Sequence, residues 1–317
     1  MTENKHTNED LKEMQSWSLE RKVRVTQTRI IEWYEHYKGQ VYVSFSGGKD
    51  STVLLDLTRR IYPDVEAVFV DTGLEYPEIR EFVKTKENVT WLKPKMSFKE
   101  VINNYGYPVI SKRQAQSIRE AKNTKSETLY KLRMTGIRSN GEFSPYSKIS
   151  EKWKSLVKAP FEVSEQCCSI MKKKPMDKYV KQTGKHPIIG TMTSESISRK
   201  NNWLKQGCNA FDKTNPSSQP LSFWTEQDVL TYLKEFSIPF ASVYGDIIHN
   251  KNKLETSGVS RTGCMFCMFG VHLEKEPNRF QRMKITHPQL YDYCIRPVEE
   301  NGLGLGEVLD YIGVKYE

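Results

Sequence analysis

The sequence predicts an α/β fold, in which helices flank a parallel twisted sheet, followed by a mainly helical C-terminal extension. Short apolar segments alternate with segments of helical spacing between residues 41 and 105, the pattern of a parallel sheet with right-handed crossovers. A turn with two adjacent glycines follows the first apolar segment. Strand-like segments become sparse after residue 245. We therefore expect a polar tail at residues 1–16, an α/β domain at 17–245 and the extension at 246–317.

The first half of the α/β domain is predicted as three strand–helix units after an initial helix. Val23, Ile30 and Trp33 recur near helical spacing within residues 17–37 and predict that helix. Pro77 stands where a helix begins, because its missing N–H is not needed in the first turn. The expected strands are residues 41–45, 66–71 and 89–92, and the expected helices are residues 51–61, 77–86 and 98–105.

The second half of the domain is less regular. Residues 110–158 are polar and basic and predict two helices, at 114–122 and 127–135, and a mobile loop at 139–150. An apolar strand follows at 185–190. Thr225 is expected to cap a helix at 225–236. The C-terminal extension is expected to hold helices at 278–286 and 306–312.

Composition excludes some classes of protein and leaves others open. No apolar run reaches 18 residues and residues 1–15 lack an apolar signal core, so we expect a cytoplasmic protein without membrane spans. The net charge of +9 fits either solubility with binding of anionic nucleotides or a nucleic-acid partner, and charge alone does not separate the two. The oligomeric state is not determined by the sequence.

The glycine turn is predicted to be an anion site. A strand, a glycine-rich turn and a helix start direct successive backbone N–H groups at a ligand, and the helix N-terminus adds partial positive charge. Gly47 and Gly48 permit close approach and positive φ, and Lys49 adds a full charge. Asp50 would repel phosphate unless a cation such as Mg²⁺ lay between them. Ser46 and Ser51 add hydroxyl donors.

Residues 46–51, Ser-Gly-Gly-Lys-Asp-Ser, resemble the pyrophosphate loop of the N-type ATP pyrophosphatases. These enzymes belong with phosphoadenosine-phosphosulfate (PAPS) reductases to the adenine nucleotide alpha hydrolase-like superfamily, whose fold is Rossmann-like. The resemblance implies ATP as substrate, cleaved between its α and β phosphates, with Mg²⁺ bound at Asp50. Lys49, Asp50 and Arg199 are the expected catalytic residues.

The same resemblance extends to two other segments. In the superfamily, an aspartate after the second strand lies near the nucleotide, and Asp71 is at the corresponding position. Asp71 is also consistent with an acidic residue that merely stabilises the turn after a strand. Residues 190–199 match the superfamily's G-x-R-x-x-E-S-x-x-R pattern except at Met192, where an arginine is common, and Arg199 fits either a phosphate clamp or a solvated helix residue. The residues expected to bind nucleotide are Ser44, Ser46, Gly47, Gly48, Lys49, Asp50, Ser51, Asp71, Thr72, Gly73, Gly190, Glu195, Ser196 and Arg199.

Four of the six cysteines form two closely spaced pairs, Cys167-Cys168 and Cys264-x-x-Cys267. Such pairs in a cytosolic chain indicate metal or redox chemistry, and a C-x-x-C pair suits zinc or an iron–sulfur cluster. Adjacent cysteines point their side chains apart, which strains a shared zinc but suits the separate iron corners of a [4Fe–4S] cube. Two buried cysteines acting as small hydrophobes are the alternative for the first pair.

Residues 167–175 also resemble the C-C-x-x-x-K-x-x-P segment of iron–sulfur adenylylsulfate (APS) reductases and of DndC-like proteins of DNA phosphorothioation, with Lys172 on the motif lysine. Residues 261–267 are more similar to the DndC-like version. The resemblance implies that Cys167, Cys168, Cys264 and Cys267 hold a [4Fe–4S] cluster and that Lys172 offsets its charge. It also implies a nucleic-acid acceptor, DNA or RNA, and a sulfur donor protein.

Three functions remain open at this point. The first is an ATP pyrophosphatase that adenylates an acceptor and serves sulfur transfer. The second is an APS or PAPS reductase, but those enzymes use a cysteine near the C-terminus in an E-C-G-(I/L)-H-like segment, whereas residues 309–317 hold none and Cys294 lacks that context. Reductases also usually lack the intact Gly-Gly-Lys-Asp loop. The third is a non-catalytic, nucleotide-sensing regulator.

Overall fold

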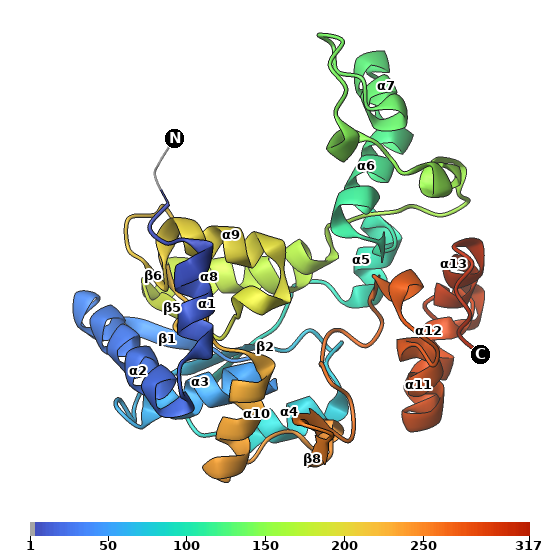
Figure 1. Ribbon diagram of the computed structural model, residues 1–317. Helices are drawn as coiled ribbons and strands as arrows, with labels where there is room; N and C mark the ends of the chain where they lie inside the picture. Colours follow the sequence, from blue (N-terminus) through green and yellow to red (C-terminus); the bar gives the residue numbers. More distant parts are fainter. Residues whose placement is uncertain (1–3) are drawn as a thin grey trace. The chain divides into compact units, whose positions relative to one another are not determined.

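The computed structural model describes residues 4–317, which fold as two compact units (Figure 1). Unit 1 comprises residues 1–71, 75–93 and 176–262, of which 1–3 lie outside the described residues. Unit 2 comprises residues 72–74, 94–175 and 263–317.

The core of unit 1 is a six-stranded sheet in the order β3-β2-β1-β5-β7-β6. All neighbouring strands pair in parallel except β6 and β7, which form an antiparallel pair. The chain moves outward from β1 through β2 to β3 and then returns to the other side of β1 with β5, so β1 and β5 flank the point where the strand order reverses. The strands are β1 Val41–Ser44, β2 Ala67–Val70, β3 Val89–Leu92, β5 His186–Ile189, β6 Asn209–Ala210 and β7 Ser217–Ser218.

Helices cover both faces of this sheet, as strand alternation requires. Val43 and Phe69 join the main core with residues from α2 and α3, whereas Tyr42 and Val68 pack on the other face with Tyr179 of α8. A β-hairpin, β8 Ile247–Asn250 and β9 Lys253–Thr256, packs against α10. The helices are α1 Asn8–Ser16, α2 Leu19–His36, α3 Lys49–Arg59, α4 Pro77–Lys84, α8 Lys174–Thr183, α9 Ile197–Gln206 and α10 Glu226–Glu235.

Unit 2 is mainly helical and is held together by one short parallel strand pair. In that pair, β4 (Val109–Ile110) lies beside β10 (Met268–Phe269), so the chain before residue 110 is joined to the chain after residue 263. A π-helical segment, η3 (Ser169–Lys173), leads directly into α8. The helices are α5 Phe98–Tyr105, α6 Lys112–Asn123, α7 Glu127–Thr135, α11 Arg279–Thr286, α12 Pro288–Ile295 and α13 Leu305–Tyr311, with 3₁₀ turns at Pro145–Ser147 and Glu151–Lys158.

The predicted fold class is confirmed, and most predicted elements appear within two residues of their expected ends. Thr225 caps α10 as expected, since its side chain accepts from the N–H of Asp228. The helix expected at 51–61 begins earlier, at Lys49, which makes Gly48 its N-cap residue. Gly48 has φ −76°, so the expected positive φ is wrong for Gly48 and holds for Gly47, at φ +70°.

Other segments differ from the expectations. Residues 8–16, assigned to a polar tail, form α1, whose capping box joins Thr7 and Asp10. The loop expected to be mobile at 139–150 is tied down by backbone hydrogen bonds, among them Ser144 N–H to Gly136 and Ile149 N–H to Arg133. The compact units also divide the chain differently from the expected boundary at 245/246, because unit 1 runs on to residue 262. Among the residues described, no helix is long and apolar enough to cross a membrane.

Candidate functional site

A cavity of about 340 Å³ lies in unit 1 at the carboxyl ends of β1 and β5. Ligands of open α/β sheets bind at this kind of place, where the strand order reverses. The glycine loop after β1 and the chain after β5 line it from two sides. The lining includes nine of the residues predicted to bind nucleotide, which are Ser44, Ser46, Gly48, Lys49, Asp50, Ser51, Gly190, Glu195 and Arg199.

The glycine loop is shaped by its own hydroxyls and by close packing. The Ser46 and Ser51 hydroxyl oxygens are 3.0 Å apart, and Ser51 donates to the carbonyl of Gly48 at 2.9 Å. A Cβ at Gly47 would lie 2.8 Å from Ile79 Cγ2, and a Cβ at Gly190 would lie 3.1 Å from the carbonyl oxygen of Asp50. Glycine is thus required sterically at position 47, whereas a side chain at position 190 would need the Asp50 backbone to shift slightly.

Lys49 lines the cavity, and its ammonium group is paired with a carboxylate. Its Nζ donates to Glu226 Oε1 at 2.9 Å, although only 5% of the Lys49 side chain is exposed. The Lys49 backbone N–H donates to the hydroxyl of Tyr244 at 3.4 Å, and that hydroxyl lies 2.6 Å from Thr262 Oγ1. Tyr244 and Thr262 therefore fix the first turn of α3 from a part of the chain about 200 residues away.

Two arginines share a second carboxylate of the cavity. Arg199 forms an ion pair with Glu195, and Arg261 Nη2 lies 3.7 Å from the same side chain. Burial lowers the pKa of Arg199, and the neighbouring Arg261 lowers it further. Such mutual repulsion favours the binding of an anion between the two guanidinium groups. Arg261 thus supplies a further cation to a cavity in which Met192 replaces the arginine common in the superfamily pattern.

Asp50 is a buried carboxylate of the cavity with cations nearby. Burial raises its pKa above the ordinary value, whereas Lys49 and Arg261 act in the opposite direction. A carboxylate oxygen beside a cradle for phosphate is a suitable ligand for Mg²⁺. The lining holds three cations (Lys49, Arg199, Arg261) and three acids (Asp50, Glu195, Glu226), so its formal charge is balanced without a ligand.

The remaining residues predicted to bind nucleotide do not line this cavity. Ser196 caps α9, accepting from the N–H of Arg199 at 3.2 Å. Asp71 accepts from Arg80 Nη2 at 2.9 Å. Thr72 and Gly73 belong to unit 2, where the neighbouring Leu74 carbonyl accepts from the N–H of Met265.

Several lining residues were not predicted from the sequence: Ile189, Thr191, Met192, Glu226, Tyr244, Ser260, Arg261 and Thr262. The sequence offered a signal for three of these residues. Arg261 and Thr262 lie just before the C-x-x-C pair, and Glu226 is the first residue of a helix whose N-cap residue was predicted. Nothing in the sequence around Tyr244 indicates its role.

The four paired cysteines all belong to unit 2, and Cys167 interacts electrostatically with the other three. Burial raises the pKa of the Cys167 thiol, and the charges of Cys168, Cys264 and Cys267 raise it further, while Lys172 lowers it. Burial also raises the pKa of Cys267, and Arg279 lowers it; the Arg279 guanidinium donates to the Cys267 carbonyl at 2.7 Å. Residues 169–173, next to the first pair, form a π-helical segment, a feature frequent at functional sites.

The donor set suits a soft, thiolate-bound metal group. None of the six cysteines is in a disulfide in the described part of the chain. Within residues 4–317, no three His, Cys, Asp or Glu side chains are gathered closely enough to hold one metal ion. A cube with four iron corners differs from a single ion, because each thiolate binds its own iron. Cys208 and Cys294 are buried elsewhere, and burial raises the pKa of both thiols.

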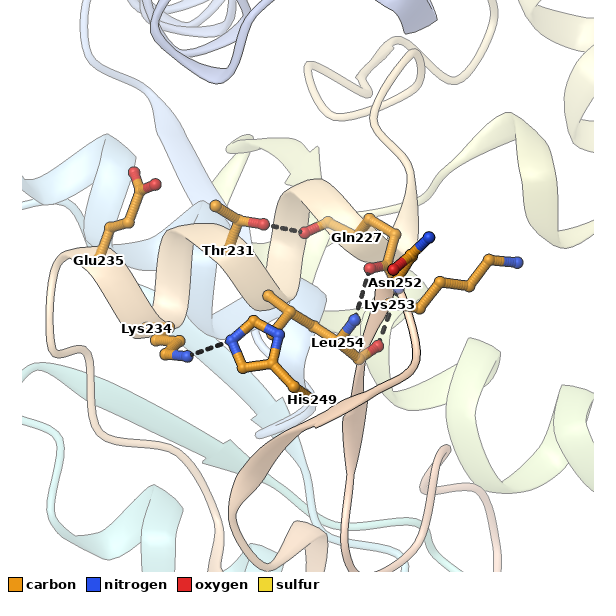
Figure 2. Close-up of a pocket in the computed structure, with 8 residues that line it drawn as sticks. All are labelled: Gln227, Thr231, Lys234, Glu235, His249, Asn252, Lys253 and Leu254. Carbon is orange, nitrogen blue, oxygen red and sulfur yellow. Dashed lines mark hydrogen bonds between the residues drawn. The ribbon is translucent and has the colours of Figure 1, made fainter.

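A second hollow of unit 1, about 580 Å³, lies between α10 and the β8–β9 hairpin (Figure 2). Gln227 joins the two elements, since its side chain donates to the carbonyl and accepts from the N–H of Leu254. Lys234 Nζ lies 2.8 Å from His249 Nε2 at the other end (Figure 2). None of the residues predicted to bind nucleotide lines this hollow.

The fold is an α/β sheet with a polar cavity at the switch point of its strand order. The sequence matches the family described as phosphoadenosine phosphosulfate reductase domain over residues 40–148 and 129–268. The chain belongs to this family of nucleotide-processing proteins, within the adenine nucleotide alpha hydrolase-like superfamily.

Individual relatives are distant. Two uncharacterised proteins of Methanocaldococcus jannaschii are 25% and 26% identical over 88% and 82% of this chain, which spans only 53% and 41% of their lengths. The adenosine 5′-phosphosulfate reductase of Staphylococcus epidermidis is 23% identical, covering 75% of this chain and 74% of the relative. Among solved structures, the phosphoadenylyl-sulfate reductase of Candida auris in a phosphate complex aligns with 14% identity, 79% and 99% coverage and a TM-score of 0.40.

Proposed function

We propose that the chain is an adenylating ATP pyrophosphatase, which releases pyrophosphate from ATP and transfers the adenylyl group to an acceptor, from which a later nucleophile displaces AMP. The observation that carries the proposal is the single cavity lined by the glycine loop, Lys49, Asp50, Arg199 and Arg261. Enzymes that only bind a sulfonucleotide need no cradle for a leaving pyrophosphate. The family match and the residues of the loop support the proposal together.

The residues of the cavity have distinct roles in this mechanism. The amides at the start of α3 and the Lys49 ammonium would bind the β and γ phosphates, and Arg199 with Arg261 would bind the α phosphate. Asp50 would hold Mg²⁺, which, when bound, neutralises phosphate charge. An acceptor oxygen forms a bond to the α phosphorus, and the bond to the bridging oxygen breaks, so that pyrophosphate leaves with the electron pair. Positioning and charge stabilisation supply most of the catalysis.

The thiol cluster is proposed to hold a [4Fe–4S] group. Cys167, Cys168, Cys264 and Cys267 would be its ligands, and the cations of Lys172 and Arg279 would offset its negative charge. The group would supply electron transfer or sulfur chemistry when bound. A role in sulfur transfer of the DndC-like kind, with a sulfur donor protein, is the finer form of this proposal.

Reduction of APS or PAPS is the second candidate, favoured by the names of the staphylococcal relatives. Cys294 is a poor nucleophile for that reaction, because its side chain is fully buried and burial raises the pKa of its thiol. The third candidate, a nucleotide-sensing regulator, would bind ATP without turning it over.

The test is anaerobic incubation with α-labelled ATP and a panel of acceptors, with product separation and a pyrophosphate assay. We expect a labelled adenylyl adduct and one pyrophosphate per adduct. Lys49→Ala and Asp50→Ala should abolish both, whereas Lys84→Ala, an exposed lysine of unit 1, should not. Pyrophosphate release that persists in both loop variants would refute the assignment, and sulfite release from APS or PAPS would favour the reductase.

A further inference from the structure

The positive charge of the chain is concentrated in one segment of unit 2. Residues 110–158 contain 12 lysines and arginines against four acids, a formal charge of +8 out of +9 for the whole chain. This segment includes α6, α7 and the turns that follow them, drawn in green in Figure 1. It contains none of the residues that line the nucleotide cavity and none of the cysteines.

Half of these cations form no ion pair in the described part of the chain. Some cations of the segment form ion pairs within the fold, namely Arg119, Lys122 and Arg133. The Arg133 guanidinium, for example, donates to the carboxylate of Glu120. Among the described residues, six exposed cations of the segment form no ion pair: Lys112, Arg113, Lys125, Lys131, Lys152 and Lys158. Exposed cations without acidic partners are suited to the phosphates of a polyanion.

Exposed aromatic rings lie among these cations. The Phe143 side chain is 62% exposed and Tyr146 is 73% exposed, and Tyr130 on α7 is exposed as well. The Arg113 guanidinium lies 5.3 Å from the centroid of the Tyr146 ring, so a cation and a ring are presented side by side. Base stacking on exposed aromatic rings is worth about 1–3 kcal/mol per base.

The loop that presents the rings is ordered. Gly136 N–H, Ser144 N–H and Ile149 N–H each bond to a backbone carbonyl, and the buried Ile149 anchors the end of the loop. The Gln114 side chain donates to Lys148 and accepts from the Ser150 N–H, which ties the loop to α6. These bonds hold the backbone of the segment that carries the rings, which reduces the ordering entropy lost on binding.

We infer that the surface formed by the six unpaired cations with Tyr130, Phe143 and Tyr146 is a binding site for single-stranded nucleic acid. The cations bind phosphates, and the rings stack on unpaired bases. A duplex would satisfy the cations but not the rings, because its bases are already stacked on one another. The features used are common to DNA and RNA, and the inference is independent of whether the chain cleaves ATP.

The test is fluorescence anisotropy with labelled 20-nucleotide dT and rU strands, a 20-base-pair duplex, and vesicles containing anionic lipid, all without ATP. We expect both single strands to bind more tightly than the duplex or the vesicles. Phe143→Ala and Tyr146→Ala should each weaken strand binding by about fivefold or more at an unchanged salt slope. Lys112→Ala and Lys125→Ala should each lower the slope of log K against log salt by about 0.7.

Matched controls are Ile285→Ala, an exposed apolar residue of unit 2, and Lys181→Ala, an exposed lysine of α8 in unit 1. Circular dichroism melting checks that each variant is folded. Equal affinity for duplex and single strand, tighter binding to vesicles, or strand binding that is insensitive to both ring substitutions would each overturn the inference.

Discussion

Because Lys49 is bonded to Glu226, we predict that removing the negative charge of Glu226 strengthens phosphate binding. The Glu226 carboxylate accepts a hydrogen bond from Lys49 Nζ at 2.9 Å, the same ammonium group that is proposed to bind a β or γ phosphate. A pyrophosphate must displace this carboxylate or share the lysine with it. Glu226→Gln keeps the size of the side chain and removes its charge.

The expected magnitude follows from the exposure of the pair. Two unit charges 4 Å apart interact by about 4 kcal/mol at an effective dielectric constant of 20. Glu226 is 48% exposed, so solvent screens most of this, and the range of about 0.2–1 kcal/mol measured for exposed pairs applies. At the upper end, about 1 kcal/mol, the dissociation constant for pyrophosphate would fall about fivefold.

The assay is isothermal titration calorimetry of pyrophosphate with Mg²⁺ at fixed ionic strength. Glu235→Gln, at the other end of the same helix, is the matched control and should leave the affinity unchanged. Weaker pyrophosphate binding by Glu226→Gln would show that Glu226 supports the cradle, and unchanged binding would show that Lys49 does not contact the phosphate; either result refutes the reasoning.

Three further predictions concern the loop, its aspartate and the thiols. Gly47→Ala should lower the free energy of unfolding, measured by urea denaturation, by about 1–3 kcal/mol. The reason is that residue 47 has φ +70° and its Cβ would collide with Ile79 and Val83. An unchanged free energy of unfolding would contradict this geometry. Burial raises the pKa of Asp50, so the ionised carboxylate lowers the stability of the folded protein at pH values above that pKa. Asp50→Asn should therefore raise Tm at pH 8, and this gain should disappear near pH 4. A difference in Tm that does not depend on pH would refute the raised pKa of Asp50. Anaerobically purified protein should contain about four irons per chain, and Cys264→Ser should lower iron content and visible absorbance while Cys208→Ser does not; a colourless zinc protein would exclude the cluster.

Local signals were enough to predict the fold and half of the cavity. The strand–glycine–helix succession around Gly47 and Lys49 is local, and so is the capping of α10 by Thr225, because neighbouring residues determine the hydrogen bonds and the backbone angles. The predicted boundary at residue 245 rested on composition alone. It could not reveal that residues 247–256 form a hairpin packed on α10, since that contact joins separate parts of the sequence.

The part of the site that the sequence did not reveal consists of long-range contacts. Glu226 reaches Lys49 across 177 residues and Tyr244 reaches it across 195. Arg261 faces Glu195 and Arg199 only because the chain returns to the strand ends after the hairpin. Such pairs depend on tertiary packing, and no spacing rule relates their positions.

A crystal structure with a non-hydrolysable α,β-methylene analogue of ATP and Mg²⁺ would test the central claim most directly. We expect the β and γ phosphates to accept hydrogen bonds from the amides of residues 47–51 and from Lys49, with the metal ion on Asp50. A triphosphate bound away from this loop, or one whose phosphates make no contact with Lys49, would contradict the account.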